Sequence, residues 1–413
     1  MQLGKESSAK PVKKNAYILA IDQGTTASRA ILYDQKGAIQ AAAQQEFPQY
    51  FPRPGWVEHD PCEIINSVNF SIQKVLRQIP DATIAAIGIT NQRETTVVWD
   101  RDTGQPVYNA IVWQCRRTAP RCRQLKKNPQ TEKLFRQRTG LPIDAYFSAT
   151  KIEWILNNVS GAAARVRQGK LLFGTMDTWV LWHLTGGQVY ATDYTNASRT
   201  MLFDIEKRVW DGDLTRRFGI SEKMLPAVKP SSGFLGKTIR QGRLVSGIPI
   251  AGMAGDQQAA LFGQACFTPG TIKNTYGTGG FLLLNTGSKR VVSQNGLITT
   301  LACGSQGEVV YALEGTIFIA GAAIQWLRDG LKILSRAADS ESMAASLKSN
   351  EGVYFVPALV GLGAPYWRPD ARGLITGITR GTTSAHLARA ALEAMCYQTK
   401  DVVEAMQKDS GLR

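Results

Sequence analysis

The chain has 413 residues, more than one compact core usually holds, so its length predicts two domains with a ligand cleft between them. Lysine and arginine total 48 against 33 aspartate and glutamate residues, a formal net charge of +15. The basic residues are dispersed and no nucleic-acid-binding motif accompanies them, so we expect no nucleic-acid partner and interpret the charge as attraction for polyanionic nucleotides. No uninterrupted apolar run is long enough to span a membrane.

The six cysteines form no Cys-x-x-Cys pair and the chain has only three histidines. This usage favours reduced thiols and a cytoplasmic location over a disulfide framework or a structural zinc site. Residues 1–15 are polar and predict a flexible tail.

Residues 16–47 predict a three-strand meander, and the loop between its first two strands is rich in glycine and threonine. Such a loop, running from Asp22 to Arg29, can turn backbone N–H groups and hydroxyls toward a phosphate. Asp22 stands at its mouth, where a phosphate-bound Mg²⁺ needs a carboxylate. An ordinary hairpin turn is the alternative interpretation of this segment taken alone.

A helix is predicted from Asp60 to Leu76, with Pro61 in its first turn, and a buried strand over 83–90. Strands and helices then alternate, the pattern of an α/β domain. Directly after the strand, Arg93 can donate several hydrogen bonds to hydroxyl groups and Glu94 can accept from two. These two side chains suit a polyhydroxylated ligand, and an ion pair at a surface turn is the alternative.

Asp256 follows an apolar strand over 248–253 and precedes a helical run. Two interpretations of Asp256 stay open on local pattern. It is a helix N-cap, or it is the carboxylate that accepts the proton of an attacking hydroxyl in phosphoryl transfer.

A second strand, glycine–threonine loop and strand occupy residues 270–285 and repeat the layout of the first hairpin. The chain ends in a helix that Ser384 is expected to cap and Gly411 to terminate. Trp113 and Phe281 either stack on a carbon skeleton or belong to the core. Neither the P-loop pattern nor the protein-kinase motifs occur, so we expect the hairpin loops to handle phosphate.

Together these segments resemble the FGGY carbohydrate kinases of the actin/hexokinase/Hsp70-like superfamily. The first family signature matches residues 146–158 (YFSATKIEWILNN) and the second matches residues 373–393. Within the family, residues 90–95 and 113–118 resemble the members that phosphorylate glycerol, whereas xylulose kinases differ at the first of these places.

The resemblance implies an α/β fold of two actin/hexokinase-like (ribonuclease H-like) domains around a cleft, with an N-terminal domain over 16–265 and a C-terminal domain over 266–413. Because the family continues past Arg413 through an adenine-contacting segment, the resemblance also implies that the second domain is truncated. The implied glycerol site consists of Arg93, Glu94, Tyr146, Asp256 and Gln257, with Trp113 and Phe281 against the carbons. Asp256 is the implied general base, and Asp22 is implied to hold Mg²⁺ through water. The residues implied to meet ATP are Thr25, Thr26, Ala27, Arg29, Thr278, Gly321 and Gln325.

The expected function is ATP-dependent phosphorylation of glycerol to sn-glycerol 3-phosphate, with glycerol, ATP and Mg²⁺ as ligands. Two alternatives stay open: a catalytically impaired polyol-binding protein derived from such a kinase, and a kinase for another small polyol or sugar. A homo-oligomer is an open expectation as well.

Overall fold

The computed structural model describes residues 16–368 and 370–412, so the predicted flexible tail over residues 1–15 lies outside the described residues. The described chain divides into two compact units by its internal contacts. Unit 1 comprises the described residues of Met1–Gln124, Asp144–Leu202 and Trp210–Asp256, and unit 2 those of Leu125–Ile143, Phe203–Val209 and Gln257–Arg413. Within 16–368 and 370–412, no helix is both long and apolar enough to cross a membrane.

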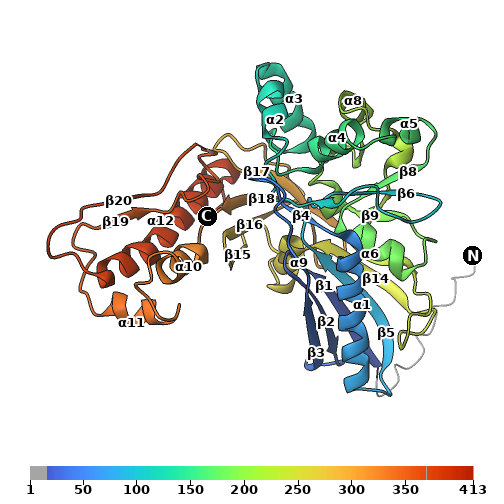
Figure 1. Ribbon diagram of the computed structural model, residues 1–413, viewed down its shortest axis with the longest axis horizontal. Coiled ribbons are helices and arrows are strands. Elements are labelled where there is room, and N and C mark those ends of the chain that lie inside the picture. The colour runs from blue at the N-terminus through green and yellow to red at the C-terminus, as the bar shows by residue number, and fades with distance from the viewer. Residues whose placement is uncertain (1–15, 369, 413) are drawn as a thin grey trace, which may run out of the picture. The chain divides into compact units, whose positions relative to one another are not determined.

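Unit 1 contains a large sheet, several short strand pairs and the helices around them (Figure 1). Its strands are β1 Ala16–Gln23, β2 Ala27–Tyr33, β3 Ile39–Glu46, β4 Glu58–His59, β5 Thr83–Asn91, β6 Val97–Asp100, β7 Ala110–Ile111, β8 Leu171–Gly174, β9 Ala191–Asp193, β12 Ala227–Lys229, β13 Ser232–Lys237 and β14 Pro249–Gly255. Its helices are α1 Pro61–Gln78, α4 Ser148–Asn158, α5 Ala162–Arg167, α6 Met176–Leu184, α7 Tyr194–Ala197, α8 Gly212–Arg217 and a 3₁₀ turn at Glu222–Met224. The division between the units passes through α2 Ala119–Lys126 and β11 Val209–Trp210.

The six-stranded sheet of unit 1 has the order β13-β14-β5-β1-β2-β3. Strands β1, β2 and β3 pair antiparallel, which confirms the predicted meander. Strand β5 runs parallel to β1, and β14 runs parallel to β5. The carboxyl ends of β1, β5 and β14 therefore meet at one edge, with Asp22 beside Thr90 and Gly255 beside Asn91. Ligands of open α/β sheets bind at this kind of edge.

Helix α1 shows how local sequence fixes an element of unit 1. The side chain of Asp60 accepts a hydrogen bond from the backbone N–H of Cys62, and Pro61 occupies the first turn, as predicted. The buried residues of α1 recur at helical spacing and pack against β1, β2 and β3 (Figure 1). The structure extends the helix from the predicted Leu76 to Gln78.

Unit 2 is built on a four-stranded antiparallel sheet of order β15-β16-β18-β17. Its strands are β10 Phe203–Asp204, β15 Ile272–Tyr276, β16 Gly280–Gly287, β17 Ile298–Cys303, β18 Val309–Ile317, β19 Tyr354–Val356 and β20 Leu374–Thr376. Its helices are α3 Pro129–Thr139, α9 Asp256–Gly263 (whose first residue closes unit 1), α10 Gly321–Asp329, α11 Asp339–Ala345 and α12 Ser384–Ser410.

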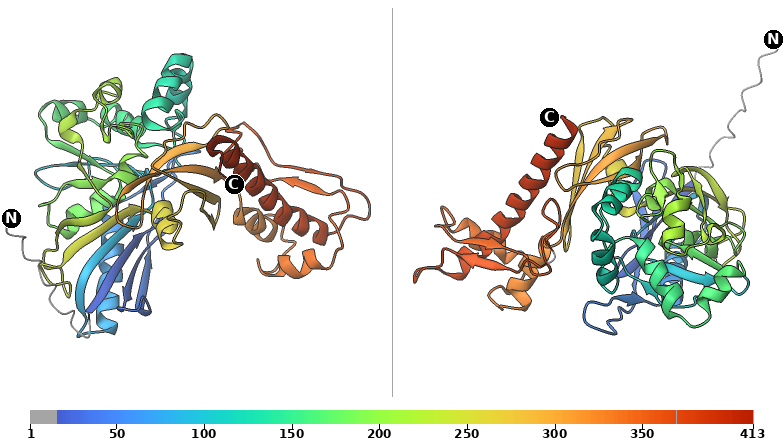
Figure 2. Two further views of the ribbon diagram at one scale, coloured as in Figure 1. Left: turned by 180° about the vertical axis from the view of Figure 1, so that it is seen from behind. Right: turned by 90° about the horizontal axis from the view of Figure 1, so that it is seen from above.

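Helix α12 packs against α10, α11 and β19 and also contacts β16 and β18 (Figure 2). It ends at Gly411 in the left-handed conformation, with φ of 69°, as predicted. The expected cap at Ser384 is wrong by one residue. Thr383 has the extended backbone of an N-cap, and a capping box joins it to His386.

Candidate active site

Polar residues that follow separate strands in the sequence lie together at the carboxyl edge of the unit 1 sheet. Arg93 and Glu94 follow β5, and Asp256 directly follows β14. The Nε atom of Arg93 lies 3.3 Å from Oδ1 of Asp256 and 3.9 Å from Oε1 of Glu94. The side chains of Arg93 and Glu94 are only 2% and 1% exposed, so they are not an ion pair at a surface turn. The side chain of Asp256 is 38% exposed and therefore accessible to a ligand.

Glu94 is held by a second arginine that the sequence analysis missed. Nε of Arg199 donates to Oε1 of Glu94 at 2.6 Å, and both side chains are buried. The guanidinium of Arg199 also lies 5.5 Å from the ring centre of Tyr146. Arg199 therefore supports two predicted glycerol-binding residues from the interior. No local motif surrounds Arg199, so only the tertiary structure reveals this role.

The predicted aromatic residue Trp113 links the first hairpin loop to Tyr146. Its Nε1 donates to Oγ1 of Thr25 at 3.0 Å, and its backbone N–H donates to Oγ1 of Thr95. The rings of Trp113 and Tyr146 meet edge to face at 5.6 Å. Trp113 is half-buried, which leaves part of its surface available to a ligand.

The loop between β1 and β2 has the tight geometry that its composition predicts. The N–H of Gly24 donates to the carbonyl of Ala27 at 2.9 Å, and a Cβ on Gly24 would lie 3.1 Å from that oxygen. Thr26 is exposed, and the exposed side chain of Arg29 donates to Gln44. The loop therefore presents a hydroxyl and a guanidinium to solvent.

Asp22, near the end of β1, is close enough to Asp256 for the charge of Asp256 to affect it. Burial raises the pKa of Asp22, the negative charge of Asp256 raises it further, and Arg29 lowers it. A carboxyl group whose ionised form is disfavoured by burial and by a neighbouring negative charge is suited to a divalent cation, which offsets both effects. The residues at this edge thus fit a magnesium ion.

Helix α9 begins at Asp256, which lies where β14 turns into the helix. The N–H of Gly255 donates to Oγ1 of Thr195 at 2.9 Å, and Thr195 in turn donates to the buried carboxylate of Asp193. This chain of hydrogen bonds fixes the backbone that carries Asp256. A side chain carried on such a backbone keeps its position relative to the sheet edge.

In unit 2 the buried Lys273, which the sequence analysis missed, connects two predicted glycerol-binding residues. Its Nζ donates to Oε1 of Gln257, to Oγ1 of Thr275 at 2.9 Å and to the carbonyl of Phe281 at 3.1 Å. Gln257 starts the part of α9 that belongs to unit 2, and Phe281 is a half-buried residue of β16. Lys273 therefore fixes the backbone of Phe281 relative to the amide of Gln257.

Three predicted nucleotide-binding residues of unit 2 lie on adjacent elements. The N–H of Gly321 donates to the carbonyl of Gly277 at 2.9 Å, and that of Ala322 donates to the carbonyl of Thr278 at 3.1 Å. Helix α10 thus begins directly on the loop between β15 and β16. Gln325 is exposed one turn farther along the same helix. Thr278 therefore lies beside the first turn of the helix that carries Gly321 and Gln325, although it precedes that helix by about forty residues in sequence.

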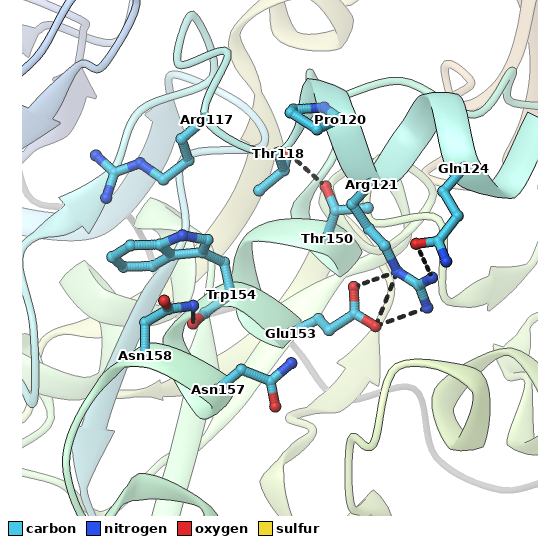
Figure 3. Close-up of a pocket in the computed structure, with 10 residues that line it drawn as sticks. All are labelled: Arg117, Thr118, Pro120, Arg121, Gln124, Thr150, Glu153, Trp154, Asn157 and Asn158. Atoms are coloured by element: carbon cyan, nitrogen blue, oxygen red, sulfur yellow. Dashed lines mark hydrogen bonds and ion pairs between the residues drawn. The ribbon is translucent and has the colours of Figure 1, made fainter.

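A shallow pocket of about 390 Å³ lies on unit 1 between α2 and α4 (Figure 3). Arg121 pairs with Glu153 at 2.9 Å beside it, and the hydroxyls of Thr118 and Thr150 bond to each other. None of the predicted site residues lines this pocket. Since these polar groups satisfy one another, we assign the pocket no part in the site.

Two α/β units, each with a glycine–threonine hairpin, and in unit 2 a helix that starts against the hairpin loop, define an actin/hexokinase-like protein. The FGGY family of carbohydrate kinases matches the chain with its N-terminal domain over residues 17–263 and its C-terminal domain over residues 272–413. The chain belongs to this family of phosphotransferases. The predicted fold class and the resemblance to the family are confirmed.

Several curated relatives share more than half of their residues with the chain. It is 60% identical to "Glycerol kinase 2" of Thermotoga maritima over 399 residues, which cover 96% of the chain and 80% of that relative. It is 59% identical to a glycerol kinase of Geobacillus kaustophilus, with the same two coverages.

Solved structures match the chain closely as well. The crystal structure of Plasmodium falciparum glycerol kinase with ADP has a TM-score of 0.89 and 37% identity, and the match covers 96% of the chain and 80% of that structure. A ligand-bound xylulose kinase from Lactobacillus acidophilus has a TM-score of 0.85 at 22% identity, over 95% of the chain and 78% of that structure, and this likeness concerns the fold alone.

Proposed function

We propose that the chain transfers the γ-phosphoryl group of ATP to a terminal hydroxyl of glycerol and so forms sn-glycerol 3-phosphate and ADP. Relatives 58–60% identical to the chain carry the name glycerol kinase, and one structural relative was solved with ADP. The observation that carries the proposal is the contact between buried Arg93 and half-exposed Asp256, beside buried Glu94. The guanidinium of Arg93 can donate hydrogen bonds to the hydroxyl groups of a small polyol, and the carboxylates of Glu94 and Asp256 can accept hydrogen bonds or a proton from them.

In this mechanism, the residues that hold glycerol are Arg93, Glu94, Tyr146, Asp256 and Gln257, and Trp113 and Phe281 lie against its carbons. The oxygen of the terminal hydroxyl forms a bond to the γ-phosphorus while the bond from that phosphorus to the bridging oxygen of ADP breaks. Asp256 receives the hydroxyl proton. Arg93 keeps the Asp256 carboxylate oriented toward the acceptor because its Nε lies 3.3 Å from Oδ1.

The nucleotide would be held by both hairpin loops. Thr25, Thr26, Ala27 and Arg29 are the proposed phosphate ligands of the first loop, and Thr278, Gly321 and Gln325 those on the nucleotide side. Magnesium bound near Asp22 would neutralise phosphate charge. The N-terminal domain, residues 16–265, would supply most of the site for the acceptor glycerol. The C-terminal domain, residues 266–413, would supply the nucleotide side.

The test of this function is glycerol-dependent ADP release by the purified 413-residue protein, beside calorimetry with glycerol and with ATP separately. ADP release supports the kinase. Glycerol binding without nucleotide binding or turnover would instead favour a non-catalytic polyol-binding protein. A panel that includes xylulose and other small polyols in place of glycerol separates the proposed acceptor from other sugars, and faster turnover of one of these would overturn glycerol as the substrate.

Asp256→Asn tests the general base. The amide keeps the shape of the side chain but accepts a proton far less well, so we expect glycerol to bind while turnover falls at least ~100-fold. Asp102→Asn, at an exposed position of unit 1, is the matched control and should keep normal turnover. Near-normal turnover of Asp256→Asn would rule out Asp256 as the base.

A further inference from the structure

Lys151 is a fully buried lysine of α4, with none of its surface exposed. Its Nζ donates to the carbonyl of Glu94 at 3.2 Å and to the carbonyl of Tyr146 at 2.7 Å. The lysine therefore bridges two chain segments, each of which carries a side chain of the proposed glycerol site. It contacts their backbones and leaves their side chains to the ligand.

The backbone of Glu94 needs such support. Its φ is 59°, in the left-handed region that residues with a Cβ seldom occupy, and such conformations persist where the surroundings fix them. Three side chains donate to its carbonyl oxygen: Oγ1 of Thr96 at 3.0 Å, Oγ of Ser148 at 3.2 Å and Nζ of Lys151. This arrangement holds the peptide after Glu94 and sets the direction of its carboxylate.

The electrostatics around Lys151 agree with a supporting role. Burial lowers the pKa of Lys151 to about 7, and the charges of Glu94, Cys115 and Asp144 oppose this effect while Arg116 adds to it. Whether protonated or neutral, the amine carries at least two N–H donors, enough for both carbonyls. An apolar side chain of similar length would leave these two oxygens without this donor.

We propose that Lys151 is a positioning residue for the acceptor alcohol, because it ties the backbone of Glu94 to that of Tyr146 and so fixes the spacing of these two glycerol-binding residues. This inference rests on the proposed function, since it concerns the same glycerol site. It adds a residue whose effect on the acceptor is indirect and whose effect on the nucleotide should be absent.

The test is calorimetric titration of the full 413-residue protein with glycerol alone and with ATP alone. Lys151→Met should raise the dissociation constant for glycerol about tenfold or more, the effect of losing two hydrogen bonds to buried carbonyls, and leave that for ATP within about twofold. Ser148→Ala removes one smaller donor from the same carbonyl and should weaken glycerol binding by about two- to fivefold. Ser148→Ala keeps the inference testable if Lys151→Met does not fold.

Arg117→Met is the matched control for loss of a buried cation. Arg117 is also buried in unit 1, but its partners are Glu58 at 2.6 Å, the rings of Trp56 and Trp154, and Sγ of Cys115, and not the carbonyl of Glu94 or of Tyr146. This variant should lower the melting temperature without changing the affinity for glycerol. Equal glycerol affinity in wild type and in folded Lys151→Met, or in Ser148→Ala when the methionine variant fails to fold, would overturn the positioning role alone. Absence of glycerol binding in the wild type would overturn the proposed function and, with it, this inference.

Discussion

Asp177 is a fully buried carboxyl group of unit 1, and its surroundings change its pKa strongly. It accepts hydrogen bonds from Oγ1 of Thr175 at 2.5 Å and from Oγ1 of Thr192 at 2.6 Å. Burial, and after it the charge of Asp193, raises the pKa of Asp177 from 3.8 to about 7. Folding therefore favours the protonated form of this side chain.

This shift predicts a dependence of stability on pH. Because the folded pKa exceeds the unfolded one, the contribution of Asp177 is fully present below about pH 4 and is lost as the pH rises through about 7. The asparagine of Asp177→Asn cannot ionise, so this variant does not undergo the loss of stability that the wild type undergoes as the pH rises. The melting temperature of the variant minus that of the wild type should therefore increase from pH 4 to pH 8. Thermal denaturation across this range measures the difference. Subtracting the two curves removes the opposite trend of His59 and His183, whose pKa values burial lowers to about 4. A difference that does not change with pH would contradict the prediction.

Some residues of the proposed site stand in a recognisable sequence pattern, and others do not. Arg93, Glu94 and Asp256 could be singled out as candidates because polar groups at the end of an apolar strand have a recognisable pattern, and their roles stay predictions. Lys151 and Lys273 could not be assigned their roles, although Lys151 lies inside a family signature. Their partners are backbone carbonyls and an amide from other parts of the chain, and only the folded structure brings these together.

At the scale of elements, the contact between α10 and the hairpin β15–β16 depends on the absence of side chains. A Cβ on Gly321 would lie 2.6 Å from the carbonyl oxygen of Gly277, and one on Gly279 would lie 2.5 Å from that of Ile317. Backbone oxygens cannot move away as a flexible side chain can. The first turn of α10 can therefore approach the loop this closely only with glycine at 321, and the loop can approach the end of β18 only with glycine at 279.

Gly321→Ala should thus displace the loop from the helix and weaken nucleotide binding. Overpacking of this kind costs about 1–3 kcal/mol, so we expect the dissociation constant for ATP to rise about tenfold while that for glycerol stays the same. Calorimetry with each ligand measures both values. Gly263→Ala, at the end of α9, is the matched control because a Cβ there meets nothing within 4 Å. Unchanged ATP affinity in Gly321→Ala would argue against Gly321 as a nucleotide-binding position.

Both hairpins and most of α12 could be predicted because their signals are local: alternating apolar residues, glycine in the loops, and a terminal glycine after a periodic run. The grouping of α3 with unit 2 could not. It depends on contacts such as the hydrogen bond from the N–H of Thr299 to the carbonyl of Gly140, which joins segments far apart in sequence. A Cβ on Gly140 would lie 2.3 Å from the carbonyl oxygen of Thr299, so this approach too requires glycine.

At the scale of the whole molecule, the two proposed ligands should affect different units to different degrees. Most proposed glycerol ligands belong to unit 1, whereas Thr278, Gly321 and Gln325 belong to unit 2. The division of the chain into an acceptor side and a nucleotide side stays a prediction, and it has a consequence that needs no catalysis. A ligand that binds only the folded state stabilises the elements it contacts against local opening.

Hydrogen–deuterium exchange of the intact protein can measure this consequence peptide by peptide. Glycerol alone should slow exchange in residues 91–96 and 146–151 of unit 1, where the Glu94 and Tyr146 backbones meet Lys151. A non-hydrolysable ATP analogue should slow exchange in residues 277–280 and 320–323 of unit 2, where α10 begins on the hairpin loop. The strands β19 and β20, which carry no proposed ligand, serve as the internal control and should exchange equally in all samples. The ATP analogue could protect none of the unit 2 peptides while glycerol protected those of unit 1. This result would contradict the assignment of the nucleotide side and would still support the acceptor site.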